Sequence, residues 1–167
     1  MNWLLSVDPG LKACGVALWS GSGVHTELVW ARAVRASVVG RGPAAWGRLA
    51  SEVMGYAPEL GVDEGRVIVE TMKVYVNGKA DPDDLFELQG IAGTVVGVAV
   101  SRKWRADGVL AREWNGTVPS DIRRERTKAW VEARGWTSRV DLNTTARFQQ
   151  DVWSAVGIGR YAFEGGR

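Results

Sequence analysis

The fold of this chain is decided by the segment Leu5-Ser6-Val7-Asp8-Pro9-Gly10-Leu11-Lys12-Ala13-Cys14-Gly15-Val16-Ala17-Leu18. An apolar strand ends at Asp8, a Pro-Gly pair turns the chain, and a second apolar strand follows the turn. A carboxylate at the tip of a buried strand is costly unless a cation meets it. The segment therefore predicts a functional site as well as a hairpin.

Two more acidic residues stand in core-facing positions. Glu70 ends the apolar run Val67-Ile68-Val69, and Asp151 interrupts the apolar stripe of a helix predicted over residues 145–163. At helical spacing Asp151 shares its face with Phe148, Ala155, Ile158 and Ala162. We find no lysine or arginine on that stripe, so a metal ion is the expected partner of the acid.

The hydrophobic periodicity and the turn residues predict an alternation of strands and helices. Strands are predicted over 3–8, 14–20, 24–34, 66–70 and 108–113, and helices over 43–56, 83–103, 119–135 and 145–163. This order predicts an α/β fold in which three antiparallel strands precede two parallel ones in a mixed five-stranded sheet. At 167 residues, of which 46% are hydrophobic, we expect one domain over residues 1–167.

Composition excludes several classes of protein. The longest uncharged stretch, Leu88 to Ser101, is judged too short and too rich in glycine to span a bilayer, and Asp8 precedes any secretory apolar region. We therefore expect a cytoplasmic protein. One cysteine, Cys14, allows no internal disulfide, and one histidine, His25, leaves no zinc cluster.

Charge is distributed unevenly, although the net charge is only +2. Residues 31–50 carry +4, residues 51–87 carry −6, and residues 102–134 carry +4. The acidic block contains Glu70. Acids that collect a metal beside bases that collect phosphate suit an enzyme that acts on a polyanion.

Asp8, Glu70 and Asp151 together predict a metal centre. Asp8 and Glu70 are expected at the ends of adjacent parallel strands, with the last helix bringing Asp151 across to them. Ligands that are all oxygen favour Mg²⁺ or Mn²⁺ over zinc. Two such ions roughly 3.5–4 Å apart would suit phosphodiester hydrolysis. The alternative is structural: Asp8 caps a turn, Glu70 pairs with Lys73, and Asp151 bonds to backbone.

Four motifs, in order along the chain, resemble the RuvC family of Holliday-junction resolvases. They are the opening segment, the strand 67–70, the helical stretch Leu88-Gln89-Gly90-Ile91-Ala92-Gly93, and Gln150-Asp151-Val152-Trp153-Ser154-Ala155-Val156-Gly157-Ile158-Gly159. The resemblance implies a ribonuclease H-like fold and a homodimer with two active sites. It also implies Mg²⁺ dependence, with Mn²⁺ able to substitute, and paired nicks across a four-way DNA junction. Asp8, Glu70 and Asp151 match the family's catalytic metal ligands.

The chain departs from the family pattern at two places, so we expect a divergent, phage-type member. Ser154 stands where the family often has a second acid or a histidine. Either Asp141 replaces that ligand through a water, or three acids suffice, and Ser154 is itself a possible ligand. Lys73 stands where members often carry an aromatic residue, and Tyr75 is the nearest candidate for stacking on a base.

Basic and aromatic residues are the expected DNA contacts. Arg123, Arg124 and Lys128 share one side of a predicted helix. The full set of expected contacts is Lys73, Tyr75, Lys79, Arg102, Lys103, Arg105, Arg123, Arg124 and Lys128. Trp104, Trp114 and Trp136 are further candidates for an interface or for DNA, because the other tryptophans fall mostly in core elements.

The expected function is that of a dimeric, Mg²⁺-dependent endonuclease that resolves four-way junctions. One alternative is a ribonuclease H-like nuclease with broader specificity for branched DNA or RNA. Another is a junction-binding protein without catalysis, which the serine at position 154 makes plausible. An actin-like ATPase would need a second phosphate hairpin and about twice the length.

Overall fold

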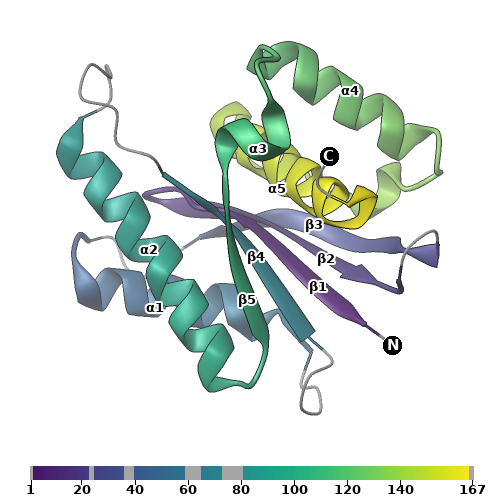
Figure 1. Cartoon of the computed structure of the whole chain (residues 1–167). Helices are drawn as coiled ribbons and strands as arrows, with labels where there is room; N and C mark the ends of the chain where they lie inside the picture. Colours follow the sequence, from purple (N-terminus) through teal and green to yellow (C-terminus); the bar gives the residue numbers. More distant parts are fainter. Residues whose placement is uncertain (1, 23–24, 36–39, 59–64, 73–80, 166–167) are drawn as a thin grey trace.

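The computed structural model describes residues 2–22, 25–35, 40–58, 65–72 and 81–165. Its five strands form a single sheet in the order β3-β2-β1-β4-β5 (Figure 1). They are β1 Trp3–Asp8, β2 Ala13–Ser20, β3 Glu27–Arg35, β4 Gly65–Thr71 and β5 Arg105–Leu110. Strands β1, β2 and β3 pair antiparallel, whereas β4 pairs parallel with both β1 and β5. The expected mixed sheet is confirmed.

Helices cover the two faces of this sheet (Figure 1). One face carries α1 Pro43–Gly55 and α2 Pro82–Ser101, and the other carries α3 Ala111–Asn115, α4 Ser120–Glu132 and α5 Ala146–Glu164, with a short 3-10 turn, η2, at Thr137–Arg139. The core is accordingly split into two layers. Leu5, Val7, Val67 and Val69 belong to the layer with α1 and α2, while Leu4 and Ile68 belong to the layer with α5.

This alternation decides where the strand-end acids point. Side chains two residues apart on a strand lie on the same face of the sheet. Asp8 therefore shares the face of Leu4 and Ser6, and Glu70 shares the face of Ile68. Both acids lie on the side of the sheet that α5 covers.

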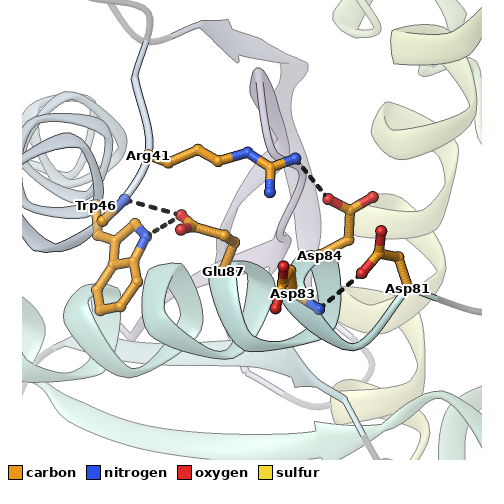
Figure 2. A network of polar contacts seen from close by, with 7 residues as sticks. Arg41, Trp46, Asp81, Asp83, Asp84 and Glu87 are labelled. Carbon is orange, nitrogen blue, oxygen red and sulfur yellow. Dashed lines mark hydrogen bonds and ion pairs between the residues drawn. The ribbon is translucent and has the colours of Figure 1, made fainter.

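Polar contacts tie α1 to α2 on the opposite face (Figure 2). The Glu87 carboxylate accepts hydrogen bonds from Trp46 Nε1 at 2.6 Å and from the Gly42 backbone at 3.0 Å. The Asp81 side chain caps α2 by accepting from the Asp83 backbone at 2.9 Å. Gly90 leaves room for the Trp46 ring, which would meet a Cβ there. This glycine therefore lets α1 and α2 pack closely.

Helix α2 nevertheless leaves an apolar face open. Only 22% of its most apolar window is buried, and Phe86 and Val100 are 68% and 58% exposed. Helix α2 is longer than the uncharged stretch from Leu88 to Ser101 on which the expectation was based, and by length and composition alone the whole helix could cross a membrane. Core helices pass the same test, and α2 packs on α1 and on β4 in this structure.

The position of β5 differs from the prediction. The strand runs from Arg105 to Leu110, three residues earlier than expected, and residues 111–115 form α3. An edge strand can be polar because one side faces solvent, and here Arg66 pairs with Asp107 across β4 and β5 at 2.7 Å. A prediction anchored on the apolar Val109 and Leu110 could not locate such a strand.

Ser6 fastens α5 to the centre of the sheet. This fully buried hydroxyl donates to the Ala155 carbonyl at 2.8 Å and accepts from Trp19 Nε1 at 2.9 Å. Gly159 lies beside the same indole, where a Cβ would collide with it. Ser6 and Gly159 therefore both contribute to the close packing of α5 on the sheet.

Replacing Ser6 with alanine should lower the free energy of unfolding by about 1–3 kcal/mol, because the Trp19 donor and the Ala155 carbonyl lose a buried partner. Chemical denaturation would measure the change. The matched control is Ser101→Ala, which removes an exposed hydroxyl bonded only to the Val98 carbonyl of its own helix. The control should stay within about 0.5 kcal/mol of wild type. Equal effects in the two variants would contradict the assigned role of Ser6.

Candidate active site

Asp8 and Glu70 lie side by side at the same edge of the sheet. Strands β1 and β4 are parallel and their register pairs Val7 with Val69, which puts the two acids level at the carboxyl ends of the strands. Glu70 is only 8% exposed. The register of the sheet therefore places these two carboxylates side by side, as predicted.

The backbone of α5 reaches the sheet at Gly15. This glycine of β2 pairs with Asp8 across the hairpin. A Cβ at Gly15 would collide with the backbone carbonyl of Asp151, and a Cβ at Gly10 would lie 3.5 Å from Asp151 Oδ2. The helix therefore carries Asp151 directly over the β1–β2 turn, beside Asp8.

Ser154 is brought to the site, and Asp141 is not. One turn after Asp151, the Ser154 side chain makes a hydrogen bond with the Asp8 carboxylate, which favours the ionised form and lowers its pKa. Asp141 lies beside the edge strand β3, where its backbone donates to the Ala31 carbonyl at 2.8 Å. Its carboxylate accepts from the Asn143 backbone at 2.9 Å. Two strand spacings, about 10 Å, separate β3 from β1.

The pKa values of all three acids are raised, first of all by burial. Burial raises the pKa of Asp8 well above its ordinary value, and the nearby charges of Glu70 and Asp151 raise it further. Burial also raises the pKa of Glu70, with a further contribution from Asp151. The pKa of Asp151 is raised to about 6 by burial. Negative charge held at one place in this way calls for a cation.

Two arginines supply part of that positive charge. Arg147 lies one helical turn before Asp151 and lowers the pKa of that acid, so the inference that no basic residue shares the stripe was wrong. Arg123 of α4 acts on both Asp8 and Glu70. Its own pKa is lowered by partial burial. The offset is incomplete, since the pKa values of all three acids remain raised.

Trp114 lies at the site, where its Nε1 donates a hydrogen bond to Glu70 Oε2 at 2.7 Å. The expectation that Trp114 contacts an interface or DNA stays a prediction, and its partner Glu70 was not foreseen. Trp104 is buried in the core, and the Trp136 ring packs edge-on against Trp130 at 5.4 Å. Only contacts distant in sequence distinguish Trp114 from the other tryptophans.

The donor set suits a hard divalent cation by its chemistry, because Asp8, Glu70 and Asp151 offer only carboxylate oxygens and lack a full counter-charge. Among the described residues, however, no three histidine, cysteine or acidic side chains converge closely enough to form a ligand shell. The residues are thus gathered at one place, while their side chains are not arranged around a common point.

The expected DNA contacts fall into three groups. Arg123 lies at the site, and its neighbours Arg124 and Lys128 on α4 pair with Glu125 at 3.5 and 2.9 Å. Arg102, Lys103 and Arg105 lie near the start of β5, at the opposite end of the sheet from Asp8. Lys73, Tyr75 and Lys79 lie outside the described residues.

Cavities flank the three acids on both sides. One, of about 280 Å³, is lined by Gly10, Lys12, Arg147 and Asp151 among others. Another, of about 560 Å³, opens beside Trp114 and Arg123. Both cavities have mixed charge in their walls. The first has Lys12 and Arg147 beside Asp81, Asp84 and Asp151, and the second has Arg123, Arg126 and Arg160 beside Glu113 and Glu164.

Comparison with solved structures places the fold among Holliday-junction resolvases. RuvC of Thermus thermophilus, in complex with a Holliday junction substrate, matches with a TM-score of 0.64 and 16% identity over 99% of this chain and 98% of that chain. The fowlpox virus Holliday junction resolvase matches with a TM-score of 0.60 and 16% identity over 97% and 98%. The yeast mitochondrial resolvase Ydc2 matches with a TM-score of 0.62 and 8% identity over 93% and 75%.

This likeness shows the fold: the mixed sheet and its flanking helices form the ribonuclease H-like α/β fold of RuvC and the other resolvases. No protein-family model matches the sequence, and no curated protein matches it. The expected structural resemblance to the RuvC family is therefore confirmed at the level of three-dimensional structure.

Replacing Gly15 with alanine should lower the free energy of unfolding by about 1–3 kcal/mol, because the new methyl group meets rigid backbone of α5 and not a flexible side chain. Denaturant titration would measure this. Gly47→Ala in α1 is the control, since nothing lies within 4 Å of a Cβ there. The control should be neutral or stabilising by up to about 1 kcal/mol. A Gly15→Ala variant as stable as wild type would contradict the close approach of α5.

Proposed function

We propose that this chain is a crossover-junction endodeoxyribonuclease, which resolves four-way DNA junctions by paired, metal-dependent hydrolysis of phosphodiester bonds. The observation that carries the proposal is the meeting of Asp8, Glu70 and Asp151 at one edge of the sheet, each with a raised pKa. The fold shared with Holliday-junction resolvases supports it.

In this proposal Asp8, Glu70 and Asp151 hold the metal, and Mg²⁺ is the natural ion for a set of carboxylate oxygens. Two bound ions would supply an activated water and stabilisation of the leaving oxygen. Binding must draw the three carboxylates inward, since no ligand shell is formed among the described residues. Ser154 contributes a hydrogen bond to Asp8 and is not needed as a ligand.

Basic side chains around the acids would orient the DNA strand. Arg123 and Arg147 already face the carboxylates, and each stands in the wall of a neighbouring cavity. In this proposal Arg123 and Arg147 contact phosphate groups of the strand, while Asp151, which also lines the cavity beside Arg147, is left to the metal. Such contacts position the backbone of the strand and carry no sequence information.

The decisive test is cleavage of a synthetic mobile four-way junction in Mg²⁺. We expect symmetric nicks in two opposing strands, and a loss of at least about 10³-fold in rate for Asp8→Asn, because a metal ligand is removed. The control is Asp141→Asn, at an exposed acid beside β3. It should cleave like wild type.

Other outcomes decide between the alternatives. Tight junction binding without any nick would indicate a binding protein. Equal cleavage of simple flaps, RNA hybrids and four-way junctions would indicate the broader nuclease.

Metal binding can be tested without cleavage. Mn²⁺ should raise the Tm of the wild-type protein by mass action and leave the Tm of Asp8→Asn unchanged. Without divalent ions, Asp8→Asn should melt above wild type, because a buried charge that its neighbours repel is gone. Differential scanning calorimetry would measure both effects. An Asp8→Asn variant that melts below metal-free wild type would contradict the electrostatic account.

A homodimer is part of the proposal, and the open face of α2 supports it. Phe86 and Val100 are exposed on this helix, which lies on the sheet face opposite the acids. A second copy that covered the two α2 helices would leave both active sites free.

The predicted cytoplasmic location stays a prediction.

Phe86→Glu should shift the protein from dimer to monomer, because a charge would be buried in the interface. Sedimentation velocity at micromolar concentration would measure the mass. Ile122→Glu is the matched control, since Ile122 is also exposed, at 45%, but lies on α4. The control should remain dimeric, and a monomeric wild type would contradict this part of the proposal.

A further inference from the structure

Three contacts converge on the indole of Trp114. Its Nε1 donates to Glu70 Oε2 at 2.7 Å. The Arg123 guanidinium lies 4.7 Å from the centre of its ring. On another side, Gly157 of α5 leaves room for the ring, since a Cβ there would come within 2.6 Å of Trp114 Cζ3.

Trp114 lies on the short helix α3, and both ends of that helix are held in place. At the start of α3, Glu113 accepts a hydrogen bond from the Leu110 backbone at 2.6 Å. At its end Gly116 adopts a φ of 59°, a conformation that glycine reaches at little cost. Because α3 follows directly on β5, the neighbour of β4, its indole can reach back to Glu70 at the end of β4.

An indole N–H donates a hydrogen bond, cannot accept one, and does not titrate. It therefore engages Glu70 Oε2 at any pH and leaves Oε1 for another partner. The hydrogen bond favours the ionised form of Glu70 and so opposes the rise in pKa that burial causes. The same arrangement is seen at Asp8, where the donor is Ser154.

Arg123 braces the indole from its open side. Its guanidinium stacks on Trp114 and its charge acts on Glu70 and Asp8. Among the described residues its buried Nε has no hydrogen-bond partner, so stacking and charge are what hold it there. The ring is thus fixed between Arg123 and Gly157, with its N–H directed at the carboxylate.

We propose that Trp114 is a positioning residue for Glu70: it holds one carboxylate oxygen so that the other is presented alone to a divalent cation. This inference rests on the proposed function, because it takes Glu70 as a metal ligand. Hydrogen bonds that orient a ligand typically change metal affinity by about 10–100-fold when they are lost. In this proposal a neutral hydrogen-bond donor, and not a further acid, organises the site.

Trp114→Phe is the direct test, because phenylalanine keeps an aromatic ring for Arg123 to stack on while it removes the N–H donor and one ring of the indole. Isothermal titration with Mn²⁺ alone should show a Kd about 10–100-fold weaker than wild type. The single-turnover rate of junction cleavage at saturating Mg²⁺ should fall, while the Kd for the junction in Ca²⁺ changes less than about two-fold. A merely structural role would not separate these readouts.

Trp136→Phe is the matched control, since the same substitution is made in the aromatic cluster of Trp19 and Trp130. Its Mn²⁺ affinity should equal that of wild type. Gly157→Ala offers a second route that does not alter the tryptophan, because the new methyl group displaces the ring. It should weaken Mn²⁺ binding as Trp114→Phe does, and it decides the question if Trp114→Phe fails to fold.

The outcomes separate the inference from the function on which it rests. Wild-type Mn²⁺ affinity in folded Trp114→Phe, beside a wild type that binds Mn²⁺ and cleaves, overturns the positioning role alone. A wild-type protein that binds no Mn²⁺ and cuts no junction overturns the proposed function, and the inference with it. Weakened Mn²⁺ binding in both Trp114→Phe and Gly157→Ala, with Trp136→Phe unchanged, supports the inference.

Discussion

The close approach of the α5 backbone to β2 at Gly15 is the constraint on which the site depends. Any side chain at that position would meet the carbonyl of Asp151, and Gly15 is itself the partner of Asp8 in the hairpin. Because Gly15 has no side chain, α5 can lie close enough to β2 to place Asp151 over Asp8. Ser6 completes the attachment by bonding the α5 backbone at Ala155 from the centre of the sheet. Packing and candidate chemistry are set by the same few atoms.

The cost of this packing is electrostatic. Asp8, Glu70 and Asp151 are moved out of water and toward one another, and the pKa of each is raised as a result. Neutral donors and nearby arginines relieve part of the repulsion without removing it. Such a site is less stable empty than filled, which is how binding a cation or a cationic complex can be coupled to folding stability.

The two faces of the sheet are used differently. The α5 face gathers the acids, Arg123 and the cavity beside Trp114, so polar groups cluster at one edge of an apolar layer. Helices α1 and α2 close the other face. They are joined by the hydrogen bond that the Trp46 indole of α1 donates to the Glu87 carboxylate of α2 (Figure 2). On that face the surface left uncovered is apolar, because α2 exposes Phe86 and Val100. Charge on one side and apolar surface on the other fit a protein that meets a polyanion and a protein partner on separate surfaces.

The sequence by itself determined the parts that local pattern encodes. Apolar runs that end in Asp8 and Glu70, turn residues between them, and an acid within a helical stripe were sufficient to predict the order of strands and helices and the three carboxylates. Tertiary structure alone decided the rest. The polar edge strand β5 was displaced because its stability comes from pairing with β4 and not from its own apolar residues. Arg147 was overlooked although it lies one helical turn before Asp151, a spacing that the sequence pattern shows. The contact of Trp114 with Glu70 and the place of Asp141 away from the three acids could not be predicted, because contacts between residues distant along the chain leave no periodic trace in sequence. Such contacts exist only once α5 has been packed onto the sheet.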